Sequence, residues 1–235
     1  MNPKYQRLSL WVALVGIILG GIGFVACAKF MPPISPALTA EEIVNLYLTD
    51  TNLKRMGFAL SMLGNGLYFP LVAVIAVQMR RMEGGITGVM GYIQISSGAV
   101  NALLLLLPSL FFTAAAFRPE RSPEITMALH DVGWFIAVMP VSSFMIQQFA
   151  IALAIFDDKS KVPVFPRWVA YMNIWVALLY LPAYLDTFFK HGPFAWNGIL
   201  AFWIPGLTFA LLWIPVMYVY LFKAIRQQEE LERCS

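Results

Sequence analysis

The sequence contains few charged residues and few of the side chains on which most soluble enzymes depend. Only 12% of the 235 residues are charged, and the chain has two His and two Cys. A soluble domain usually carries about 25% charged residues, so a protein with this little charge cannot face water over its whole surface. The net charge of +3 is small and dispersed. Without a dense basic tract, we expect no nucleic-acid partner.

The shortage of Cys and His excludes several kinds of site. Cys27 and Cys234 would lie on opposite sides of the membrane in the topology predicted below, which makes a disulfide between them implausible. No Cys/His cluster has the spacing of a metal site, so the sequence predicts no metal and leaves any cofactor unknown. The chain also lacks a nucleotide-binding glycine motif. It has neither a lysine well inside a span for retinal nor paired intramembrane histidines for haem.

Apolar residues, in contrast, make up 60% of the chain, and the mean hydropathy is +0.71. They gather in six stretches, each long enough for a helix to cross a bilayer, which takes about 20 residues. The predicted fold is therefore all-α, a polytopic transmembrane helical bundle that forms a single domain over 1–235. The predicted spans cover 8–29, 56–79, 89–112, 128–156, 168–189 and 199–222.

The first apolar stretch resembles a signal sequence because an A-C-A tripeptide at 26–28 looks like a cleavage site. Its apolar run over 8–24 is longer than the 7–15-residue core of a signal peptide, so we expect a retained span. Gly16, Gly20 and Gly23 share one face of this helix. Small residues at such a spacing allow another helix to approach closely.

Two further segments differ from simple spans. A capping-box pattern from Thr39 to Glu42 predicts a helix over 40–49, too short to cross and expected to lie on the outer membrane surface. The apolar stretch 125–156 would form a helix of about 48 Å at 1.5 Å per residue. It must tilt, protrude or kink at Pro140 to fit a hydrocarbon core of about 30 Å. Prolines also lie inside spans at 70, 108, 182, 205 and 215.

Loop charges predict the orientation of the bundle. The N-terminus, the turn at 80–81, the loop 157–167 and the tail hold ten Lys and Arg, against six on the other side. The positive-inside rule then places both termini in the cytoplasm. We expect a bacterial-type cytoplasmic membrane.

Polar side chains at membrane depth are the main indications of function, because each is costly there unless it is paired or hydrated. Gln94, Ser97 and Asn101 share one face of the third span, and amides of other spans could face the same interior. We favour interhelical hydrogen bonds, worth about 0.6–2 kcal/mol each, with a polar cavity or permeation route as the alternative. The predicted ligand-binding set for that alternative is Asn65, Gln94, Ser97, Asn101, Trp134 and Asn173.

Titratable side chains gather near the outer ends of the fourth and fifth spans. His130, Asp131 and Asp186 could act as general acid and base. Adjacent helical residues point about 100° apart, so His130 and Asp131 cannot both face one ligand squarely. Ordinary hydrated interfacial residues are the favoured interpretation, and a catalytic set is the alternative.

Three functions are compatible with this pattern. The first is a protein that binds or transports a hydrophobic or amphipathic small molecule within the bundle. The second is a small membrane enzyme acting on a lipid-like substrate, and the sequence does not decide whether the chain is an enzyme. The third is an accessory subunit of a larger membrane complex, docked through the glycine face of the first span. The expected partners are membrane lipids, a hydrophobic small molecule, and a second copy or another membrane protein.

Overall fold

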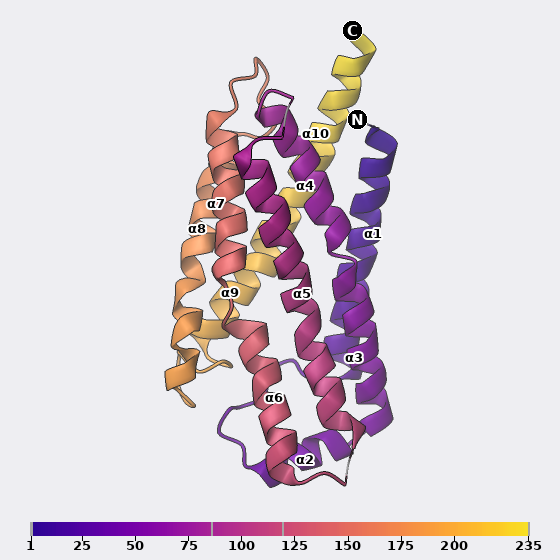
Figure 1. The fold of residues 1–235 in the computed structure, drawn as a ribbon, viewed down its shortest axis with the longest axis vertical. Helices are drawn as coiled ribbons and strands as arrows, with labels where there is room; N and C mark the ends of the chain where they lie inside the picture. Colours follow the sequence, from indigo (N-terminus) through magenta and orange to yellow (C-terminus); the bar gives the residue numbers. More distant parts are fainter. Residues whose placement is uncertain (1, 86, 119, 235) are drawn as a thin grey trace.

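The computed structural model describes residues 2–85, 87–118 and 120–234, and its helices form one elongated bundle (Figure 1). Six helical stretches are long and apolar enough to cross a membrane, which confirms the predicted all-α bundle of six spans. Both termini lie at one end, called here the termini end, and the short helix α2 lies at the opposite end, called the α2 end (Figure 1). The stretches are Pro3–Cys27, Thr51–Met82, Val89–Phe117, Pro123–Asp157, Arg167–Phe188 and Ile199–Arg233.

The first span packs against the second through glycines. It consists of α1 (Pro3–Gly21) and a π-helical end, η1 (Ile22–Cys27), and it lies along α3 (Thr51–Gly66). A Cβ atom added to Gly23 would lie 2.5 Å from the carbonyl oxygen of Gly57, and one added to Gly16 would lie 2.5 Å from that of Gly64. Only glycine allows this approach. The glycine face is therefore buried within the chain, and the expectation that it docks a partner is wrong.

The second span is interrupted, whereas the third is continuous. After α3 the chain turns at Leu67 and Tyr68 and enters α4 (Phe69–Met82), which carries Pro70 in its first turn, where proline is tolerated. In contrast, α5 (Val89–Phe117) continues through Pro108 and is longer than predicted. The added turns are held by Arg55 of α3, whose Nε and Nη2 donate to the carbonyl oxygen of Ala116 at 3.1 and 2.8 Å.

The fourth span is two helices joined at a proline. Helix α6 (Pro123–Val138) ends two residues before Pro140, and α7 (Ser142–Asp157) begins two residues after it. Of the three alternatives left open for this span, the structure shows the kink at Pro140. Since proline lacks an N–H and its ring clashes with the preceding turn, the helix opens here, halfway along the bundle (Figure 1).

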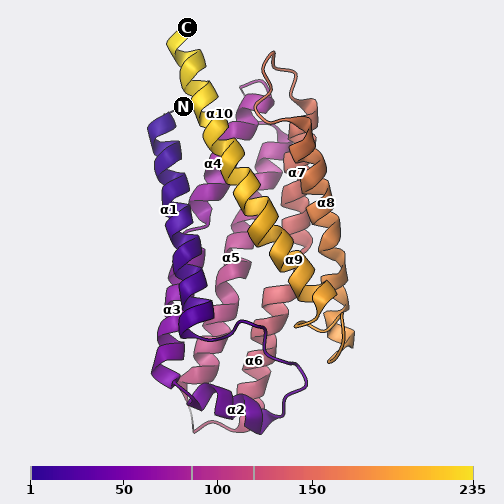
Figure 2. The ribbon, with the colours of Figure 1, turned by 180° about the vertical axis from the view of Figure 1, so that it is seen from behind.

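The last two spans are also irregular. Helix α8 (Arg167–Leu179) becomes the 3-10 helix η2 (Leu181–Phe188) beyond Tyr180. The sixth span crosses the back of the bundle diagonally (Figure 2) and mixes π-helical and α-helical turns around Pro205. Its elements are η3 (Ile199–Trp203), α9 (Ile204–Leu207), η4 (Thr208–Trp213) and α10 (Ile214–Cys234). Helix α10 runs well beyond the predicted end at 222.

The short predicted helix is present as α2 (Ala40–Leu48), and its capping box is formed. The backbone N–H of Thr39 donates to the Glu42 carboxylate at 2.7 Å, and the N–H of Glu42 donates to the Thr39 hydroxyl at 3.3 Å. The N–H and the hydroxyl of Thr39 both donate to the Glu42 carboxylate, and these two hydrogen bonds hold the pKa of Glu42 below its ordinary value. Helix α2 lies across the end of the bundle (Figure 2) and buries Ile43 and Tyr47 against it.

Candidate ligand-binding site

Two apolar clefts lie where the helices are interrupted. Cleft A, of about 150 Å³, is open on one side and lies between the Pro140 break, α5, the end of α8 and the Pro205 turn. An engineered cavity of about this volume in another protein binds benzene, so cleft A has room for a short length of hydrocarbon. Its lining residues are Leu105, Ala137, Val138, Val141, Phe144, Tyr180, Ala201, Phe202, Pro205, Gly206 and Phe209.

Cleft B adjoins cleft A and has a similar volume, about 140 Å³. Leu105 and Phe209 line both clefts, which places the two clefts side by side. Cleft B is lined by Ile17, Gly64, Asn65, Tyr68, Leu105, Phe209, Ala210 and Ile214. Every residue that lines either cleft is uncharged, and most are apolar. Together the clefts suit a hydrocarbon chain at the depth of the helix breaks.

A hydrogen-bonded amide pair lies deeper in the bundle, behind cleft B. The side-chain Nδ2 of Asn101 on α5 donates to Oε1 of Gln147 on α7 at 2.7 Å, and both side chains are almost fully buried. The hydroxyl of Tyr68, which lines cleft B, donates to the same Oε1 across 3.5 Å, a long and weak bond. The amide of Gln147 fits because Gly98 opposite it has no side chain: a Cβ there would lie 2.6 Å from Nε2.

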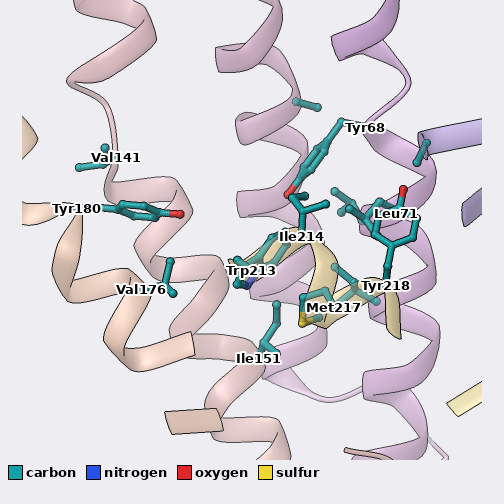
Figure 3. Packing of buried hydrophobic residues seen from close by; sticks show 14 of the residues in the cluster. Tyr68, Leu71, Val141, Ile151, Val176, Tyr180, Trp213, Ile214, Met217 and Tyr218 are labelled. Carbon is teal, nitrogen blue, oxygen red and sulfur yellow. The ribbon is translucent and has the colours of Figure 1, made fainter. Parts of the chain in front are cut away.

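A second tyrosine connects cleft A to the same region. Tyr180 lines cleft A, and its hydroxyl accepts a hydrogen bond from Nε2 of Gln148 at 3.1 Å. Figure 3 shows the hydroxyls of Tyr68 and Tyr180 both directed toward the bundle interior, above Trp213 of the sixth span. We call Tyr68, Asn101, Gln147, Gln148 and Tyr180 the amide–tyrosine cluster. It joins α4, α5, α7 and α8 behind the two clefts.

The predicted ligand-binding residues are only partly brought together. Asn65 lines cleft B while its Nδ2 donates to the Leu105 carbonyl at 2.7 Å, and Asn101 belongs to the cluster. Gln94 donates to the Val72 carbonyl of α4. Both ends of the Asn173 side chain are bonded, to Val169 and to Trp213, and Ser97 bonds its own helix. The favoured interpretation, interhelical hydrogen bonding, describes Asn65, Gln94, Asn101 and Asn173 in the structure.

Trp134 and His130 lie in an aromatic core toward the α2 end and line neither cleft, although Trp134 packs against Phe202 of cleft A, with ring centroids 6.2 Å apart. The indole N–H of Trp134 donates to Nε2 of His130 at 3.1 Å, and Nδ1 of His130 lies 2.9 Å from the hydroxyl of Tyr47. Because indole is only a donor, Nε2 must be unprotonated, so the neutral ring carries its proton on Nδ1 and donates it to Tyr47. Burial raises the pKa of the Tyr47 hydroxyl well above its ordinary value, and the nearby charge of Asp131 adds to this.

Among the described residues, neither acidic member of the predicted catalytic set is a hydrogen-bond partner of His130, whose ring bonds to Tyr47 and Trp134. Asp131 is only partly buried, whereas Asp186 is 2% exposed and neither of its carboxylate oxygens has a hydrogen-bond partner among the described residues. The favoured interpretation as hydrated interfacial residues is therefore wrong for His130 and Asp186, which the bundle shields from water. Within residues 2–85, 87–118 and 120–234, no group of three His, Cys, Asp or Glu could hold a metal ion.

Comparison with known proteins does not extend this description. No family model, curated protein or solved structure matches the chain. The function must therefore be argued from the site alone.

The sequence alone did not predict the two tyrosines that connect the clefts to the amides of Gln147 and Gln148. Tyr68 and Tyr180 each stand two residues before a proline, Pro70 and Pro182. This shared Tyr-x-Pro pattern marks two of the points where a helix is interrupted, and at each of them the tyrosine points inward. The apolar lining had no such signal, because a leucine that lines a cleft and a leucine that faces lipid are alike in sequence.

Proposed function

We propose that the chain is an integral membrane protein that binds or transports a hydrophobic or amphipathic small molecule, which enters sideways from the lipid. The observation that carries this proposal is cleft A, an apolar space open on one side at the Pro140 break. Ligand sites in proteins are typically concave, mostly apolar and supplied with a few placed polar groups. The two clefts with Tyr180, Asn65 and Tyr68 fit that description.

The position of the clefts favours entry from the membrane. In membrane proteins, broken helices line cavities because the freed backbone groups need partners, and cleft A lies beside such a break at Pro140 and beside the irregular helical turns around Pro205. Lipid tails are as apolar as leucine, so hydrophobicity alone does not favour the cleft over the bilayer. Selectivity has to come from shape and from the polar groups behind the clefts.

An enzyme built on His130 is less well supported. Both nitrogens of its ring are engaged, by Tyr47 and Trp134, inside an aromatic core, so neither is free to exchange a proton with a substrate. The roles assigned to His130, Asp131 and Asp186 stay predictions, as does any accessory role in a larger complex.

We also propose a bacterial-type cytoplasmic membrane as the location, with both termini in the cytoplasm. The support is the excess of Lys and Arg in the loops at the termini end. In this orientation α2 covers the outer end of the bundle.

Photolabelling with a diazirine-bearing hexadecane tests the binding proposal. We expect the purified full chain in phosphatidylcholine vesicles to be labelled on the peptides that line cleft A, and Ala137→Phe to reduce that labelling about tenfold, or ~1.4 kcal/mol. Ala128→Phe is the matched control, since Ala128 and Ala137 are both exposed on α6 but only Ala137 lines the cleft. Equal labelling of the two variants, or no label on these peptides, would contradict the proposal.

A further inference from the structure

The amide–tyrosine cluster leaves several polar atoms without partners. Oδ1 of Asn101, Nε2 of Gln147 and Oε1 of Gln148 are buried, and the described residues offer no hydrogen-bond partner to any of them. The side chains that carry them are 0%, 1% and 1% exposed. A buried polar group left unpaired costs about 1–3 kcal/mol, so three such atoms in one region indicate that another molecule completes the hydrogen bonding.

One hydroxyl group matches the amide pair. Asn101 presents an acceptor and Gln147 presents N–H donors, while a hydroxyl has one donor and two acceptor lone pairs. A single hydroxyl can therefore donate to Oδ1 of Asn101 and accept from Nε2 of Gln147. A primary amide, with both donors and an acceptor, is the other simple match.

A charged head group does not match the cluster. All five of its members are uncharged, and so is every residue that lines the two clefts. The buried side chains that can carry charge, among the residues described, are Lys54, His130 and Asp186, none of which lines a cleft. A carboxylate, phosphate or ammonium would thus be buried at membrane depth without a counter-ion, which is unfavourable.

Tyr68 gives such a head group a way in. Its ring lines cleft B, and its hydroxyl holds Gln147 only by the 3.5 Å bond. Displacement of the Tyr68 hydroxyl would open a path by which a ligand hydroxyl reaches Oδ1 of Asn101 and Nε2 of Gln147 while its chain stays in the cleft. Aromatic rings lie along this path. Phe209, which lines both clefts, lies 6.5 Å from the Tyr68 ring and 5.6 Å from the Phe144 ring, measured between ring centroids.

We infer that the amide–tyrosine cluster is the head-group subsite of this protein, and that its ligand is an uncharged single-chain lipid carrying a hydroxyl or primary amide. The hydrocarbon chain of the ligand occupies clefts A and B. This inference rests on the proposed function, because it assigns the polar end of the molecule that the clefts would bind.

Four probes that differ only in the head group test the inference: diazirine-bearing hexadecanol, hexadecanoic acid, hexadecylamine and hexadecane. Each labels the purified full chain in phosphatidylcholine vesicles, and the label on cleft residues is corrected for that on Tyr171 and Trp175 of α8, which are exposed and line neither cleft. We expect hexadecanol to exceed each of the other three about tenfold, the value of roughly one hydrogen bond or one unpaired charge.

A double variant, Asn101→Leu with Gln147→Leu, removes the amide pair while keeping its approximate volume. Replacing both partners by apolar groups can be nearly neutral for stability. We expect the preference for hexadecanol over hexadecane to fall from about tenfold to about onefold, with hexadecane labelling unchanged. Asn52→Leu, the same change at an exposed asparagine outside the clefts, should keep the preference. The comparison of probes on the unmodified chain stands even where a variant does not fold.

The outcomes separate the two proposals. Equal labelling by hexadecanol and hexadecane would mean that water alone satisfies the amides, and this would overturn the inference while the clefts remain a binding site. Stronger labelling by the acid or the amine would overturn it as well. If none of the four probes labels the cleft peptides, the proposed function itself fails.

Discussion

At the scale of single residues, His130 shows how a titratable side chain can serve the fold instead of chemistry. Its ring nitrogens bridge Tyr47 of α2 and Trp134 of α6, and Phe30 and Phe112 pack around it with centroids 5.8 and 5.7 Å away. A buried histidine bonded on both sides is held neutral and in one tautomer. The hydrogen-bonded chain therefore fastens α2 to the bundle.

Removing the Tyr47 hydroxyl tests this role. Tyr47→Phe keeps the ring but leaves the Nδ1 proton of His130 unpaired, so we expect the free energy of unfolding to fall by about 1–3 kcal/mol. The measurement is thermal unfolding of the purified protein in mild detergent. Tyr92→Phe makes the same change on a tyrosine that is 63% exposed on α5 and should leave the midpoint unchanged. Equal midpoints for both variants would show that the bond to His130 contributes nothing.

The type of a residue predicted that the amides are paired in the interior of the bundle, but it did not predict that two tyrosines lie there. Asn101 was selected because an amide at membrane depth needs a partner, and it has one in Gln147. The interior positions of Tyr68 and Tyr180 could not be predicted from residue type, because tyrosine is common at membrane interfaces. The burial of His130 and Asp186 was missed for a related reason: sequence gives the depth of a residue along a span, not which face of the helix it occupies.

At the scale of helices, the packing of the first span on the second depends on glycine more than on any other residue. A Cβ on Gly64 would collide with the backbone nitrogen of Gly20 and the carbonyl oxygen of Gly16. Backbone atoms cannot move aside as a flexible side chain can, so α1 and α3 would have to separate along their length.

Alanine substitutions distinguish a packed glycine from an open one. We expect Gly64→Ala to lower the free energy of unfolding by about 1–3 kcal/mol or more, as overpacking does. Gly21→Ala should be neutral or stabilising by up to ~1 kcal/mol, because its Cβ would meet nothing within 4 Å and alanine favours helix. Thermal unfolding and the yield of folded protein measure both changes. If Gly64→Ala behaves like Gly21→Ala, the close packing of α1 on α3 is wrong.

Proline shows what a sequence can and cannot say about a helix. The excessive length of the fourth span made a break at Pro140 one of three alternatives, whereas Pro108, which also lies inside a span, leaves α5 continuous. The two differ in their surroundings: α5 is packed against α3, α4, α6 and α7, which hold it straight. Such tertiary support has no local sequence signature. The clefts, which depend on the breaks that persist, could therefore not be located beforehand.

At the scale of the whole molecule, the number of spans followed directly from hydropathy, since a segment of about 20 apolar residues indicates a helix that crosses the membrane. The ends of the spans were less predictable. Thr51–Met82 and Pro123–Asp157 reach beyond the predicted 56–79 and 128–156, and their first helices, α3 and α6, both pack against α2. Orientation depends on a charge bias of ten against six and needs its own experiment.

Cysteine accessibility in intact cells measures that orientation. In a chain with Cys27→Ser and Cys234→Ser, one new cysteine is placed either by Ser160→Cys, in the exposed loop at the termini end, or by His191→Cys, in the exposed loop after η2. With the termini in the cytoplasm, a membrane-impermeant maleimide should label the His191→Cys chain in intact cells and the Ser160→Cys chain only after permeabilisation. The reverse pattern would invert the topology. Only the fifth span separates the two loops, so they must lie on opposite sides of the membrane. Labelling of both cysteines in intact cells would contradict this arrangement.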